Sequence, residues 1–163
     1  MKLVYTYAFV SILLESVLSI YLKGIYLPLF SIVSLVIIYP FFNNDNKKYI
    51  LFASFFGLFY DISMTDTLFL NFFLFFLISI IIIYINELLT NNFLIVTFIS
   101  FITIVSYRFL TLLILFLVSF SPFEVEILLN SITNSLFTNL IYALLSYLLL
   151  DYISKKFKIK KID

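Results

Sequence analysis

Five polar side chains interrupt the apolar stretches of this sequence, and their chemistry sets the possible functions. They are Glu15, Asp61, Asn71, Arg108 and Asn139. A guanidinium and a carboxylate inside a bilayer can pair, line a proton or solute path, or recognise a carboxylate or phosphate group. Arg108 is the only arginine of the chain, and a cation in hydrocarbon costs roughly 2.5–3.5 kcal/mol on insertion scales. We therefore expect Arg108 to face protein groups or water rather than lipid.

The overall composition is that of an integral membrane protein. Of the 163 residues, 64% are hydrophobic and 12% are charged, and the mean hydropathy is +1.18. One polytopic domain, residues 1–163, accounts for the whole length. The sequence has no cysteine and no histidine, which excludes cysteine redox chemistry, histidine-ligated metals and histidine-dependent catalytic triads. We expect no catalytic residue, no cofactor, no metal and no nucleic-acid partner.

Hydrophobic runs separated by short polar breaks predict an all-α fold, a six-helix transmembrane bundle. Short breaks place consecutive helices side by side and antiparallel. The six predicted spans are residues 3–22, 25–42, 49–64, 67–85, 93–120 and 127–153.

The lysines predict the orientation of the bundle in the membrane. Eight lysines lie on the side of the two chain ends, and only Lys23 lies on the other side. Basic residues favour the cytoplasmic side, so both termini are expected in the cytoplasm. The eight are Lys2, Lys47, Lys48, Lys155, Lys156, Lys158, Lys160 and Lys161.

The five polar residues lie at similar depths in five different predicted spans. Counted from the cytoplasmic end of each helix, all five come out roughly 18–23 Å along the axis. They can therefore meet in one polar layer, where Arg108 has Glu15 or Asp61 as its counter-charge and the two asparagines add hydrogen bonds. Such a layer either fixes the register of the helices or lines a functional site, and the sequence leaves both interpretations open.

A second polar feature is a stripe along the last predicted span. Its members recur at spacings of three and four residues, so they share one helix face that turns inward or toward a partner protein. Hydrogen bonding between helices explains most of this stripe. The alternative is that the stripe, together with the segment 122–129, contacts a partner protein. The stripe consists of Ser131, Asn134, Ser135, Thr138 and Tyr142.

The segment 57–71 carries a spaced motif around the third and fourth spans. A glycine and an aspartate stand four residues apart, and a leucine and an asparagine follow after a short turn; these residues are Gly57, Asp61, Leu68 and Asn71. The motif resembles the signature of the bacterial rod shape-determining protein family MreD. Thr65 stands where the turn usually has glycine, and Phe69 stands where the family commonly has glycine. The chain length, the six predicted spans, the basic tail and Asn139 also fit this family.

The resemblance implies a non-enzymatic membrane subunit of the cell-elongation (Rod) machinery, which regulates cell shape and builds the lateral peptidoglycan wall. It implies an MreC-like protein as the direct partner. The glycosyltransferase RodA, a penicillin-binding transpeptidase, RodZ and MreB filaments belong to the same machinery.

Two other functions stay open on sequence grounds. The polar layer, with Arg108 holding an anionic group, would suit a small solute-binding subunit like the S component of an energy-coupling-factor vitamin transporter. An enzyme using Glu15 or Asp61 as a base is the weaker alternative, because no nucleophile or metal-ligand spacing accompanies these acids.

Overall fold

The computed structural model describes residues 2–22, 27–43, 45–65, 67–89, 93–120 and 122–157. Within these ranges the chain is all-helical, as the predicted fold class requires. Lys23, the beginning of the second predicted span and the tail lysines Lys158, Lys160 and Lys161 lie outside the described residues. In chain order the helices are α1 (Lys2–Leu22), α2 (Phe30–Ile38), the 3₁₀ helix η1 (Tyr39–Phe42), α3 (Asn46–Met64), α4 (Leu70–Leu88), α5 (Phe93–Leu117) and α6 (Val125–Lys156).

Four of the described helices, α1, α4, α5 and α6, are long and apolar enough to cross a membrane. Helix α3 also has 19 residues, but it carries three charged residues, Lys47, Lys48 and Asp61. At 1.5 Å per residue, the 32 residues of α6 extend about 48 Å, well beyond the roughly 30 Å of a hydrocarbon core.

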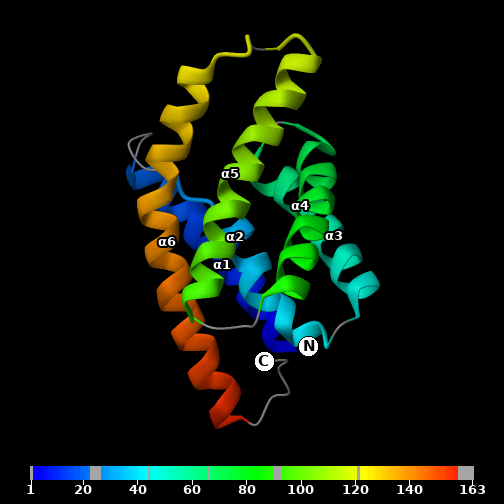
Figure 1. Cartoon of the computed structure of the whole chain (residues 1–163), viewed down its shortest axis with the longest axis vertical. Helices are drawn as coiled ribbons and strands as arrows, with labels where there is room; N and C mark the ends of the chain where they lie inside the picture. The colour runs from blue at the N-terminus through cyan, green and yellow to red at the C-terminus, as the bar shows by residue number, and fades with distance from the viewer. Residues whose placement is uncertain are drawn as a thin grey trace.

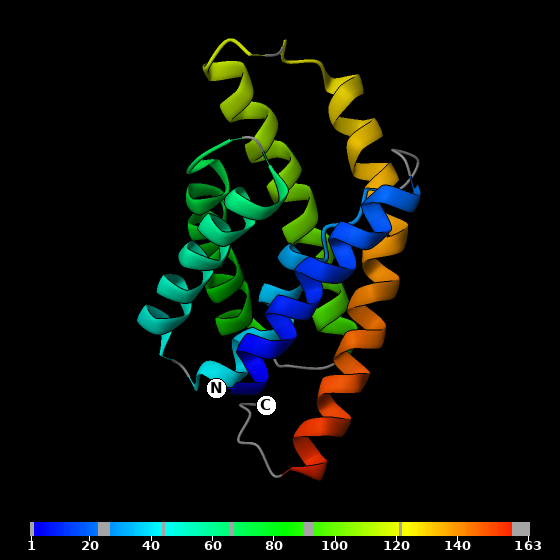
Figure 2. The same ribbon diagram turned by 180° about the vertical axis from the view of Figure 1, so that it is seen from behind.

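The helices form a bundle with two distinct ends. The beginning of α1 and the end of α6 lie at one end, called here the lower end, as drawn in Figure 1. The α5–α6 connection lies at the opposite, upper end, where the two helices diverge (Figures 1 and 2). Helices α3 and α4 pack closely as an antiparallel pair, and α5 pairs with α6. Helix α2 lies between α1, α5 and α6.

The second helical element is shorter than the sequence predicted. A span over residues 25–42 was expected, but helix begins only at Phe30. Leu27–Leu29 is not helical, and Pro28 disfavours helical backbone at the residue that precedes it. The nine α-helical and four 3₁₀ residues together measure about 22 Å, less than the hydrocarbon thickness.

This short element is enclosed by the rest of the protein. Every residue of Phe30–Phe42 is buried. An element shorter than the hydrocarbon thickness is thus shielded by the neighbouring helices. Two of its serines are buried as well, and the Ser34 hydroxyl donates to the Ser31 carbonyl over 2.7 Å. Tyr49 of α3 is fully buried beside it and donates from its hydroxyl to the Leu35 carbonyl over 3.0 Å.

Candidate functional site

Glu15 of α1 caps the beginning of the buried helix α2. Its carboxylate accepts the Ser31 N–H over 2.8 Å and the Ser31 hydroxyl over 2.7 Å. The Tyr60 hydroxyl of α3 donates to the other carboxylate oxygen over 2.6 Å. Leu29, the residue before the helix, has no side chain that could do this. The buried carboxylate therefore satisfies an N–H that the first helical turn leaves free, at the positive end of the helix dipole.

Asp61 of α3 does the same for α4. Its carboxylate accepts the backbone N–H groups of Asn71 and Phe72 over 3.0 and 3.1 Å. The Asn71 side-chain amide donates to it over 2.8 Å. Phe69, which precedes the helix, supplies no cap of its own. Both buried acids are thus bound to the beginning of a neighbouring helix.

The hydrogen bonds at Asp61 continue into α5. The Tyr107 hydroxyl donates to the Asn71 side-chain oxygen over 2.7 Å, so Asp61, Asn71 and Tyr107 link three consecutive helices. The side-chain oxygen and nitrogen of Asn71 both form hydrogen bonds, which fixes the orientation of this amide. All three side chains are buried.

The other motif residues shape the same α3–α4 hairpin. A Cβ at Gly57 would overlap the backbone carbonyl of Asn71 and would lie 3.0 Å from the Phe75 Cβ. Only glycine allows α3 and α4 to approach this closely. Phe69 has φ 68°, the left-handed conformation that glycine adopts most easily. Helix α4 therefore begins at Leu70, three residues later than predicted.

Asn139 of α6 forms hydrogen bonds with the backbone of the non-helical segment before α2. Its side-chain oxygen accepts the Leu29 N–H over 2.7 Å, and its side-chain nitrogen donates to the Leu27 carbonyl over 3.0 Å. The Leu27 N–H donates to the Asn134 carbonyl over 3.2 Å. Irregular backbone at membrane depth needs partners of this kind, because lipid offers none. Pro28, between the two leucines, has no N–H to satisfy.

Arg108 does not form the expected ion pair. In the described part of the chain, neither Glu15 nor Asp61 has an oxygen within 4.0 Å of its guanidinium nitrogens. Within the described ranges, its hydrogen bond runs from Nε to the Ser135 hydroxyl of α6, over 3.4 Å. The prediction of a direct pair was wrong, because the two acids are already held by helix N–H groups. The hydrogen bonds of the expected layer form four groups, at Glu15, at Asp61–Asn71, at Asn139 and at Arg108, while Glu15 and Arg108 still interact electrostatically.

The polar stripe of α6 also divides by contact. Ser135 is buried under Arg108, and Ser131 donates to the Leu128 carbonyl over 2.8 Å. Tyr142 stacks on Phe30 of α2, with ring centroids 4.1 Å apart. Asn134 is exposed. Ser135 and Tyr142 therefore serve contacts within the chain, and Asn134 is the stripe member most accessible to a partner.

Three residues of these contacts were not anticipated from the sequence: Ser31, Tyr60 and Tyr107. Tyr60 and Tyr107 directly precede Asp61 and Arg108, but they are two of 12 tyrosines and nothing in their spacing distinguishes them. Ser31 had a usable signal, since a serine near the beginning of an apolar run often marks a helix N-terminus.

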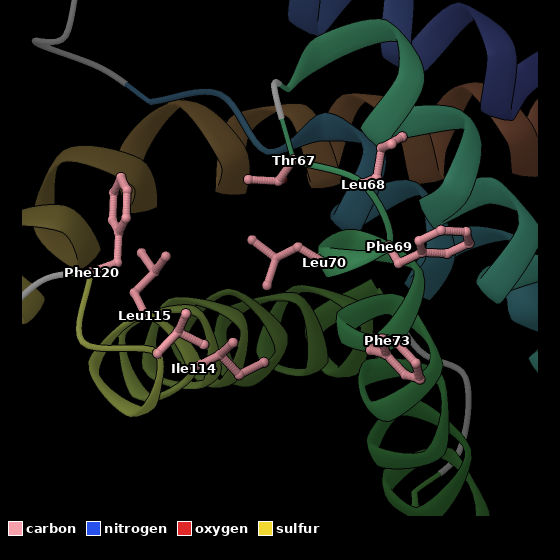
Figure 3. A pocket seen from close by; sticks show the side chains of 9 residues that line it. Thr67, Leu68, Phe69, Leu70, Phe73, Ile114, Leu115 and Phe120 are labelled. Atoms are coloured by element: carbon pink, nitrogen blue, oxygen red, sulfur yellow. The ribbon is translucent and has the colours of Figure 1, made fainter.

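An apolar groove opens near these contacts at the upper end. It lies between the beginning of α4 and the end of α5 and has a volume of about 350 Å³ (Figure 3). The motif residue Leu68 contributes to its wall and is 71% exposed. The groove side chains include Leu70, Phe73, Leu115 and Phe120.

The chemistry of the site is dominated by helix capping. Among the described residues, no three of the residue types His, Cys, Asp and Glu are close enough together to hold a metal ion. Comparison of the chain with known proteins finds no matching family model, no similar curated protein and no similar solved structure.

Proposed function

We propose that this chain is a non-enzymatic, multi-pass subunit of the bacterial cell-elongation machinery, similar to MreD, that binds an MreC-like protein. The observation that carries the proposal is the joint geometry of the motif. Gly57 packs against the Asn71 carbonyl, Asp61 caps the helix that Asn71 begins, and Leu68 lines the adjacent groove. Three residues fix the α3–α4 hairpin, and the fourth is presented at its surface.

The proposed placement puts the lower end in the cytoplasm. Lys47 and Lys48 begin α3, and Lys155 and Lys156 end α6, both at the lower end. The positive-inside rule then gives six helices with both termini in the cytoplasm, with α2 and η1 as an enclosed, shortened second element. Before any tilt, Val125 lies about 45 Å along the α6 axis from Lys155, about 15 Å beyond a 30 Å core.

That projection supports the upper end as the partner surface. Apolar side chains there are exposed outside the expected hydrocarbon, where water is a poor neighbour for them. Together with the groove they suit the single membrane helix of an MreC-like protein and the segment that follows it. RodA, the transpeptidase, RodZ and MreB then belong to the wider complex. The exposed apolar residues are Phe116, Leu117, Val118, Phe120, Phe123, Val125, Ile127 and Leu129.

Co-purification tests the proposal directly. The tagged chain, expressed at its native level, should recover a one-span protein with an extracytoplasmic coiled coil. Leu68→Ser and Phe120→Ser should reduce that recovery. Tyr152→Ser, at an equally exposed position near the lower end of α6, should not. Recovery of no such protein, together with normal cell shape after depletion of the chain, would refute the function.

A further inference from the structure

The guanidinium of Arg108 has hydrogen-bonding capacity that the protein does not use. Its Nε donates to Ser135 over 3.4 Å, a long hydrogen bond. In the described chain its two terminal nitrogens have no acceptor, although an arginine offers five N–H donors in a planar fork. Ser135 itself donates to the backbone carbonyl of Ser131.

The acids of the bundle interior are not available to complete this fork. Glu15 accepts three hydrogen bonds from Ser31 and Tyr60. Asp61 is engaged by Asn71 and Phe72. Among the described residues, no carboxylate oxygen lies within 4.0 Å of the Arg108 guanidinium, and Glu15 interacts with its charge only from farther away.

The terminal nitrogens of Arg108 are also not sealed inside the protein. Among described residues, the enclosed polar side-chain atoms without a partner belong to Tyr7, Thr138 and Tyr142. Arg108 is absent from this group, and its side chain is partly exposed. An acceptor from outside the protein can therefore reach the guanidinium.

The surroundings define what kind of molecule can approach. Phe109 follows Arg108, and Phe101 lies two helical turns below it; both are exposed, at 42% and 40%. Phe98 and Leu94 continue this apolar surface toward the lower end. Arg108 is about 22 Å along α5 from Phe93, in the half of the membrane nearer the upper end. A ligand there has an anionic group at Arg108 and an apolar body directed toward the middle of the bilayer.

We propose that Arg108 binds the phosphate group of an amphiphile whose apolar chains lie on the exposed face of α5. Phosphate oxygens match the planar guanidinium fork in pairs, and charge-assisted hydrogen bonds of this kind are the strong ones. A phospholipid of the outer leaflet supplies both the phosphate and the chains. This site is independent of the partner surface at the upper end.

Native mass spectrometry of the full chain in detergent, with added phosphatidylglycerol, tests the site. The wild type should retain one bound phosphatidylglycerol. Arg108→Gln should weaken retention by about tenfold to a hundredfold, the loss expected for a charge-assisted pair. Arg108→Lys keeps the charge but loses the planar fork, so its retention of the lipid should be intermediate. This variant replaces Arg108→Gln in the test if the glutamine variant does not fold. Lys48→Gln, which removes an exposed cation at the beginning of α3, should behave as the wild type.

Two further probes identify the ligand chemistry. Diacylglycerol with the same chains lacks the phosphate and should be retained far less well than phosphatidylglycerol. Inorganic phosphate alone should neither bind nor displace the lipid at millimolar concentration. Equal retention of phosphatidylglycerol by Arg108→Gln, equal retention of diacylglycerol, or binding of inorganic phosphate without lipid would each overturn the proposal. The last result would instead favour a soluble anionic solute.

Discussion

Replacing Asp61 with alanine should remove the cap of α4 and destabilise the bundle. Two backbone N–H groups and the Asn71 amide lose a charged acceptor in a buried place. A hydrogen bond to a charged group contributes about 1.5–3 kcal/mol. Because the three donors share one carboxylate, their contributions do not add fully. We expect a loss of about 3–4 kcal/mol in the free energy of unfolding, and about half of that for Asp61→Asn, which keeps one oxygen acceptor.

Unfolding in mixed micelles, followed by circular dichroism, measures the loss. Hydrogen exchange locates it, because the amides of Asn71 and Phe72 should lose protection before the rest of α4 does. Asp45→Ala is the matched control: Asp45 caps α3 through the Lys48 N–H over 3.1 Å, but at an exposed position, so its loss should be smaller. Equal losses for the two alanine variants, or unchanged exchange at Asn71 and Phe72, would refute the capping role of Asp61.

Three further substitutions or conditions have defined outcomes. Gly57→Ala should push α3 away from α4, because its Cβ would lie 2.8 Å from the Asn71 carbonyl carbon; overpacking costs about 1–3 kcal/mol, and an unchanged melting temperature would contradict the close approach. Phe69→Gly should raise the melting temperature by relieving a strain of about 1 kcal/mol at φ 68°, whereas Phe73→Gly, inside the helix, should lower it. The hydrogen bonds from Lys48 lower the pKa of Asp45. This stabilisation is present above the ordinary aspartate pKa and is lost as pH falls through the lowered folded value. Below about pH 4, the melting temperature of the wild type should therefore fall more than that of Asp45→Asn. Parallel pH profiles of the two proteins would contradict this contribution of Asp45.

Sequence reasoning selected polar residues that are buried better than it identified their hydrogen-bond partners. Glu15, Asp61, Asn71 and Asn139 are all buried, and hydropathy alone was enough to select them. Counting residues along a helix gives height but not distance across the bundle, so Arg108 was expected within ion-pair distance of an acid, whereas Glu15 interacts with it only from farther away. The partners of both acids include backbone N–H groups at helix beginnings, and every residue except proline carries such a group.

The prediction of the helix boundaries failed for a related reason. The second span was predicted from an unbroken apolar run, and the non-helical Leu27–Leu29 segment inside it is marked only by Pro28. Its hydrogen bonds come from Asn134 and Asn139, more than 100 residues away along the chain. A local pattern cannot report a partner that only the folded bundle brings close.

The link between Leu29 and Asn139 orders events during synthesis. The two residues are separated by 110 positions, and chains grow at about 5–20 residues per second. The Leu29 N–H must therefore wait roughly 5–20 seconds before α6 exists to accept it. During that interval the segment before α2 has backbone groups that lipid cannot satisfy. Seating of α2 between its neighbours is thus a late step, completed only when the last helix enters the membrane.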